Sequence, residues 1–138
     1  MVTRRRERHA RARALQALYA CDMRGGDLLP VARHVFDDLA VEAPERALAE
    51  SLIAIVATRG AELDEALAAV TTNWRLDRIG AIERSLLRLG AAELARGDTP
   101  PRVVLQEAVQ LAERFGGMQS ARFVNGVLDA LARHMGRL

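Results

Sequence analysis

Residues 78–96, RIGAIERSLLRLGAAELAR, predict the fold class of this chain, because their apolar residues repeat at spacings of three and four. This period is that of a helix with one buried face. The stripe comprises Ile79, Ile82, Leu86 and Leu89, and Leu87 and Leu94 widen it. A face this wide is typical of a helix that is covered on several sides. The segment is therefore expected to be a central helix.

The same spacing continues on both sides of this segment, and no sustained alternation predicts a strand. Glycine and proline pairs mark where the helices should begin and end. The expected helices are a first one ending at Gly25-Gly26, a second from Pro30 to about Leu39, a third from Pro44 with a bend near Gly60, one from Pro100-Pro101 to Gly116-Gly117, and a last one capped by Ser120. The pattern breaks around Trp74. The sequence predicts an all-α protein of six or seven helices.

One local signal opposes this prediction. Asn125-Gly126 between apolar residues is a common hairpin signature, but the helical stripe continues past it to Met135. We therefore expect a helix here. Glycine inside a helix costs about 1 kcal/mol relative to alanine, so close packing of a neighbouring backbone is expected to compensate at Gly126.

The chain has 138 residues, which fits one domain over residues 1–138 with a core that needs no disulfide. Cys21 is the only cysteine, so a several-cysteine metal site is not expected. No run of about 18 apolar residues predicts a membrane span, and the charged N-terminus leads into no signal-peptide core. We expect a cytoplasmic protein without a cofactor.

Charge is distributed unevenly along the chain. All twenty basic residues are arginine, a preference that a GC-rich genome explains. Base composition does not explain their positions: residues 1–24 hold seven arginines against two acids, a net charge of +5, and residues 25–138 have a net charge of −3. A basic N-terminal arm on a mildly acidic body favours a polyanionic partner.

Few residues predict catalysis. The three histidines are scattered, and the chain has no HExxH, phosphate-binding glycine loop or GxSxG turn. Most carboxylates fall on the polar sides of predicted helices. Glu93 lies close to the apolar line of residues 78–96, where it is expected to accept hydrogen bonds from a helix N-terminus or to pair with an arginine. We do not expect an enzyme.

Arginine is well suited to RNA, because its planar guanidinium group binds phosphates and stacks on bases. Aromatic side chains that could also support bases are scarce. Tyr19 follows the arginine-rich segment, and Phe123 lies beside Arg122 near the start of the last helix. Spacing alone favours core packing of both rings over contact with bases.

Four stretches in series resemble the NusB family of bacterial transcription antitermination factors. They are ARARALQALYACD at 10–22, RLDRIGAIERSLLRLGAAEL at 75–94, TPPRVVLQEAVQLAERFG at 99–116 and SARFVNGVLDAL at 120–131. The resemblance covers essentially the full length. It implies an all-helical domain of two packed sub-bundles without catalytic activity. It also implies that the protein and the ribosomal protein NusE bind boxA RNA of nascent ribosomal RNA transcripts and, with other Nus factors, help RNA polymerase avoid premature termination.

Carried onto this chain, the resemblance implies an RNA-binding surface on the first and last helices. Its members are Arg5, Arg6, Arg8, Arg11, Tyr19, Gln119, Arg122 and Phe123. Arg8 and Arg11 are the favoured contacts of the arginine-rich segment. The NusE-binding residues are expected to be Asp77 and Glu83, because acidic groups suit a basic ribosomal protein.

Two alternatives remain open from the sequence. The chain could be a helical protein-binding scaffold without RNA specificity, or the NusB-like accessory domain of a truncated ribosomal RNA methyltransferase. A homodimer formed through apolar helix faces is also possible.

Overall fold

The computed structural model describes residues 4–71 and 79–138, and these residues form helices and connecting segments without a strand. The helices are α1 (Arg4–Arg24), α2 (Leu28–Asp38), α3 (Ala43–Val70), α4 (Ala81–Arg96), α5 (Pro101–Phe115) and α6 (Met118–His134). Six helices in the described residues confirm the predicted all-α class. Trp74 and Asp77 lie outside the described residues.

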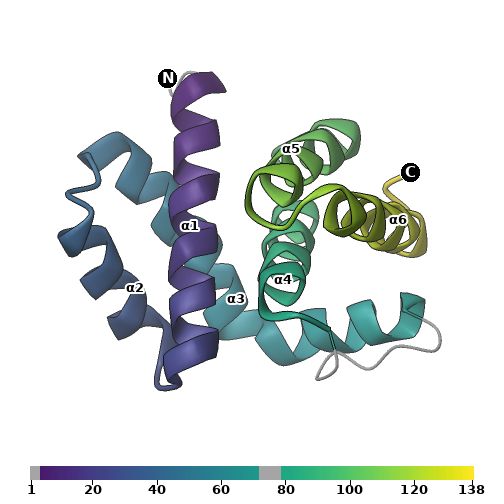
Figure 1. Cartoon of the computed structure of the whole chain (residues 1–138). Helices are drawn as coiled ribbons and strands as arrows, with labels where there is room; N and C mark the ends of the chain where they lie inside the picture. Colours follow the sequence, from purple (N-terminus) through teal and green to yellow (C-terminus); the bar gives the residue numbers. More distant parts are fainter. Residues whose placement is uncertain (1–3, 72–78) are drawn as a thin grey trace.

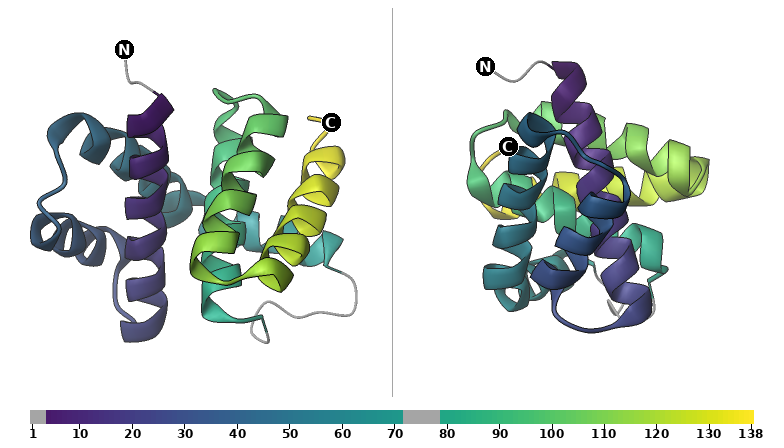
Figure 2. Two further views of the ribbon diagram at one scale, coloured as in Figure 1. Left: turned by 45° about the horizontal axis from the view of Figure 1, so that its top comes forward. Right: turned by 90° about the vertical axis from the view of Figure 1, so that its left-hand side faces the viewer.

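The helices form two sub-bundles that meet along α1 and α4 (Figure 1). α1 packs against α2 and α3, and α4 packs against α5 and α6. α3 passes behind α1 and continues beneath the second sub-bundle (Figure 1). Figure 1 and the left view of Figure 2 show α5 between α1 and α6. Buried apolar side chains from all six helices join in one hydrophobic core.

α4 is the central helix that its sequence predicts. It contacts α1, α3, α5 and α6, and its buried positions include Leu86, Leu87, Leu89 and Leu94. It ends at Gly97, whose φ of +79° is favourable for glycine because it has no Cβ. A helix buried on several sides needs apolar residues beyond a single stripe, which is why Leu87 and Leu94 widen the pattern.

The predicted starts and bends are mostly observed. Pro30 and Pro44 lie in the first turns of α2 and α3, and α3 has a non-helical residue at Arg59, beside the predicted bend. The prediction that Ser120 caps the last helix is wrong, since α6 begins at Met118. Ser120 is a buried residue inside it, and its hydroxyl contacts Glu83 and the Gly116 carbonyl oxygen.

Asn125 and Gly126 are helical, as the stripe predicts, but the reason offered for the glycine is wrong. Gly126 is exposed, and a Cβ built there meets no atom within 4 Å. The glycine that is closely packed is Gly90 of α4, where a Cβ would lie 2.5 Å from Cδ1 and 2.9 Å from Cδ2 of Leu128 on α6. Leu128 is fully buried.

No helix in the described part of the chain is both long and apolar enough to cross a membrane.

Alanine substitution at these two glycines should have opposite effects on stability. Gly126→Ala should raise the free energy of unfolding by about 1 kcal/mol, because alanine is the better helix former and the site is open. Gly90→Ala should lower it by about 1–3 kcal/mol, because the new methyl group forces buried Leu128 out of position. Urea denaturation of both variants measures the difference, and stabilisation by both would contradict the close contact of α4 and α6.

Candidate nucleic-acid interface

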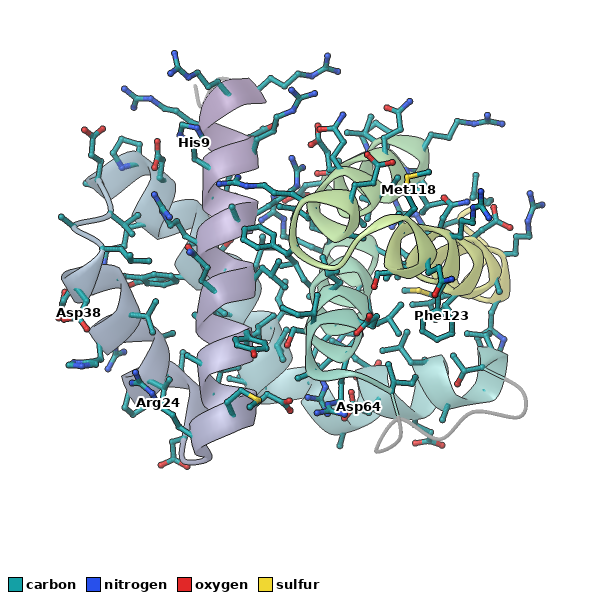
Figure 3. All side chains as sticks on the ribbon, in the orientation of Figure 1. His9, Arg24, Asp38, Asp64, Met118 and Phe123 are labelled. Carbon is teal, nitrogen blue, oxygen red and sulfur yellow. The ribbon has the colours of Figure 1, made fainter. Side chains whose placement is uncertain are left out.

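The first turns of α1 carry most of the basic arm and extend away from the core. Arg4, Arg5, Arg6 and Arg8 are exposed, whereas burial begins at Ala10. Figure 3 shows side chains with terminal nitrogen atoms spreading from this end of α1, around His9. The sequence RRRER offers no apolar residue to pack inward, so these turns remain in solvent.

A hollow of about 580 Å³ separates the start of α1 from α5. We call it the α1/α5 hollow. Arginine side chains line it from both helices: Arg4, Arg5, Arg8 and the buried Arg11 from α1, and Arg114 from α5. Glu107 of α5 is nearly buried and accepts a 3.0 Å hydrogen bond from Nε of Arg8, whose side chain stays 48% exposed. Arg8 therefore retains donors that a ligand can use.

A second and larger concave surface, of about 820 Å³, lies between α5 and α6. We call it the α5/α6 groove. Gln110 lines both this groove and the α1/α5 hollow, so the two surfaces adjoin along α5. Arg122 of α6 also lines the groove. α5 thus connects the two parts of the RNA-binding surface that the resemblance implies, on α1 and on α6.

Most arginines outside this region are neutralised within the protein. Arg84 donates two hydrogen bonds to Asp22, and these bonds hold the pKa of the Asp22 carboxyl below its ordinary value against the opposing effect of burial. Arg88 pairs with Asp64 at 2.9 Å. Other arginine–carboxylate pairs away from the two hollows are Arg46 with Asp37 and Glu50, Arg59 with Glu62, and Arg96 with Asp98. Arg133, which lines the α5/α6 groove, pairs with Asp129.

By contrast, several arginines around the two hollows form no ion pair with any described residue. They are Arg4, Arg5, Arg102, Arg114 and Arg122. Arg114 lies over its neighbouring ring, with its guanidinium carbon 4.9 Å from the centroid of Phe115. Charges without an internal partner are available to an anionic ligand. We define Arg4, Arg5, Arg8, Arg114 and Arg122 as the arginine surface.

Arg11 does not belong to this surface, and its assignment as a favoured RNA contact needs correction. Its side chain is only 6% exposed, and Nε and Nη2 donate hydrogen bonds of 2.6 and 3.0 Å to the two carboxylate oxygens of Glu93. Burial lowers the pKa of the guanidinium, but the hydrogen bonds and charge of Glu93 outweigh that effect, and the pKa lies above its ordinary value. The arginine partner foreseen for Glu93 is thus Arg11.

The other predicted RNA contacts lie at several places on the molecule. Tyr19 is 37% exposed, and about 16 Å of helix separates it from Arg8, on nearly the same side of α1. Gln119 is exposed in the first turn of α6. Phe123 is partly buried against the core, and Figure 3 shows it on the side of α6 facing the end of α3. The ring of Phe123 has a packing role, whether or not a base contacts it.

Of the two predicted acidic contacts, the structure describes Glu83, which is less accessible than the arginine surface. Asp77 lies outside the described residues, and Glu83 is half-buried in the first turn of α4. Its carboxylate accepts a hydrogen bond from the Ser120 hydroxyl and folds back towards Gly80. Glu83 therefore ties the start of α4 to the start of α6.

Arg114 and Gln110 were missed by the sequence analysis. Both lie in the stretch TPPRVVLQEAVQLAERFG, where helical spacing predicted polar positions but gave no sign that α1 would be alongside. Among residues 4–71 and 79–138, no group of three or more His, Cys, Asp or Glu side chains could hold a metal ion.

Comparison with known proteins gives a consistent set of relatives. A model of the NusB family matches residues 8–133. The chain is 44% identical to the transcription antitermination protein NusB of Anaeromyxobacter dehalogenans (strain 2CP-1 / ATCC BAA-258), an alignment covering 95% of this chain and 92% of that protein. It is 41% identical to the protein of the same name from Sorangium cellulosum (strain So ce56), with 93% and 92% covered.

A solved structure is also similar, described as antitermination factors NusB and NusE in complex with dsRNA. The matched chain superposes with a TM-score of 0.86 at 28% identity, covering 96% of this chain and 99% of that one.

Replacing one partner of the Arg11–Glu93 pair should lower the free energy of unfolding more than replacing both partners. Glu93→Leu leaves a buried guanidinium without its partner and should lower the free energy of unfolding by about 3–5 kcal/mol. The double variant Arg11→Met/Glu93→Leu should be more stable than that single variant, because no charge stays buried. Denaturant titration measures both. A double variant no more stable than Glu93→Leu would contradict the unpaired buried charge as the cause of the loss.

Proposed function

Because the chain belongs to the NusB family, we propose that it is a transcription antitermination factor that binds boxA RNA of nascent ribosomal RNA transcripts together with NusE. With RNA polymerase and the other Nus factors, this complex opposes premature termination. The relatives are named for antitermination, and one similar structure is described as containing both NusE and RNA.

The observation that carries the RNA-binding role is the arginine surface on α1, α5 and α6. Arg4, Arg5, Arg114 and Arg122 form no ion pair with a described residue, whereas the arginines of the body are mostly paired. An exposed guanidinium group binds a phosphate with two parallel hydrogen bonds. Several such groups along one surface fit the backbone of a single RNA strand.

We assign the RNA contacts to the arginine surface together with the remaining predicted residues. These are Arg5, Arg6, Arg8, Tyr19, Gln119, Arg122 and Phe123, with Arg4 and Arg114 added and Arg11 removed. Arginines neutralise phosphates, and the exposed part of Tyr19 supports a base. The RNA then runs along α1 and crosses to the start of α6.

NusE is assigned to Glu83, in the first turn of α4, and to Asp77, which precedes that helix in sequence. A ribosomal protein is expected to be basic, and complementary charge accelerates encounter and fixes register. The Glu83–Ser120 hydrogen bond joins the start of α4 to the start of α6, which supports neighbouring positions for NusE and RNA. The NusE and RNA surfaces would then be neighbours.

In this role the chain works by binding rather than by catalysis, as a single RNA-binding domain in the cytoplasm. The surface offers charge and shape for a polyanion, and no reaction is needed for an adaptor.

Fluorescence anisotropy of labelled boxA RNA and a scrambled control, with and without NusE, tests the proposal. We expect tighter binding to boxA, strengthened by NusE, and a logarithmic salt slope of about −0.7 for each phosphate neutralised. Arg5→Gln and Arg122→Gln should each reduce the magnitude of the slope by about 0.7.

Arg33→Gln is the matched control, because Arg33 of α2 is exposed, forms no ion pair with a described residue and lies in neither hollow. Its slope should equal that of the unmodified protein. Equal, weak binding to both RNAs with unchanged slopes in all variants would refute the RNA-binding role and favour the protein-binding scaffold.

A further inference from the structure

The α5/α6 groove extends beyond the residues assigned to boxA, and its chemistry is distinctive. Arg102 and Gln106 of α5 and Asn125 of α6 line it, and all three are exposed. Positions 102, 106 and 110 are separated by four residues, so they form one polar row along α5. Asn125 contributes to a facing row on α6. Two rows of hydrogen-bonding side chains thus border one channel.

The floor of this channel is formed by apolar side chains that are largely buried. Leu105 is 9% and Ala121 4% exposed, and Val109 is half-buried between them. Met118, at 62% exposure, projects at the end near the start of α6 (Figure 3). Met118 and Leu138, the latter 38% exposed, are the exposed large apolar side chains of its lining. Flat bases can rest on such a floor while their edges meet polar side chains.

The charges of the groove also favour a nucleic acid. Arg102 and Arg122 form no ion pair with a described residue. Asp129 is bound to Arg133 at 3.0 Å, so Glu113 is the one lining carboxylate, among the described residues, without an ion pair. The carboxamides of Gln106 and Asn125 carry a donor and an acceptor each, which is the pattern that base edges match.

From these features we infer that the α5/α6 groove binds nucleotides flanking boxA on the same RNA strand. This inference rests on the proposed function, and Gln110, which lines both hollows, joins the groove to the arginine surface. The row from position 102 to 110 is about 12 Å long, which accommodates about three or four stacked nucleotides. The groove therefore lengthens the RNA footprint beyond the boxA element.

RNAs of different length provide the test, with and without NusE. The first is boxA alone, and the others extend it by about six nucleotides on the 5′ or the 3′ side. One extension should tighten binding by about tenfold in anisotropy titrations, as one or two base contacts would. The other extension should leave the affinity unchanged, because only one end of the strand points towards the groove.

Variants of groove residues test whether the gain in affinity for the extended RNA arises in the α5/α6 groove. Arg102→Gln and Asn125→Ala should each remove most of the gain from the favourable extension while leaving boxA alone bound as before. Glu113→Gln should tighten binding of the extended RNA further, because it removes a negative charge that faces phosphates. A gain of affinity cannot arise from misfolding. Arg33→Gln again serves as the control and should change neither RNA.

Two sets of results would overturn the inference while the proposed function stands. In the first, boxA alone binds well and neither extension helps. In the second, the gain survives in Arg102→Gln and Asn125→Ala, or NusE abolishes it, which would assign the groove to a protein partner. Failure of boxA itself to bind would overturn the proposed function and this inference together.

Discussion

The buried ion pair between Arg11 and Glu93 is the interaction on which the arrangement of this protein depends. It joins α1 of the first sub-bundle to α4 of the second, with both groups almost fully buried and two parallel hydrogen bonds between them. A planar pair of this kind tolerates little rotation, so it fixes how α1 lies relative to α4 and its neighbour α5. The Arg8–Glu107 bond continues the same link one turn nearer the N-terminus. Without this orientation, the arginines of α1 and α5 would not line one hollow.

Arginine therefore has two roles in this protein, and the role depends on whether a carboxylate of another helix is within reach. Arg11, Arg84 and Arg88 meet carboxylates on other helices and hold the sub-bundles together. Arg4, Arg5 and Arg122 meet none among the described residues and keep their charge for solvent or a ligand. The net charge of +5 in residues 1–24 shows where the excess positive charge lies. It does not show which of these arginines forms an ion pair within the protein. That depends on tertiary contacts.

Helical periodicity, which is local, predicted the class, the central helix and the bend in α3, whereas features that depend on distant contacts were missed. Arg11 looked like its neighbours because its partner is 82 positions away, although the apolar surroundings of Glu93 were a usable signal. Gly126 and Gly90 look alike in sequence, and only the approach of Leu128 distinguishes them. Gln110 and Arg114 line the α1/α5 hollow because α5 lies beside α1. The RNA and NusE contact residues themselves remain predictions.

Presenting arginines on packed helices has a consequence for recognition. A disordered arginine-rich segment must lose conformational entropy when it binds, and this cost reduces its affinity. Here the packed parts of α1, α5 and α6 are held by the core and by the Arg11–Glu93 and Arg8–Glu107 pairs, and the arginine-rich turns continue the same helix α1, so less backbone needs to order. Under the proposed function, the positions of the guanidinium groups impose a path on the RNA backbone. Sequence preference would then come from the polar side chains along that path, which are concentrated on α5 and α6 rather than on the arginine-rich start of α1.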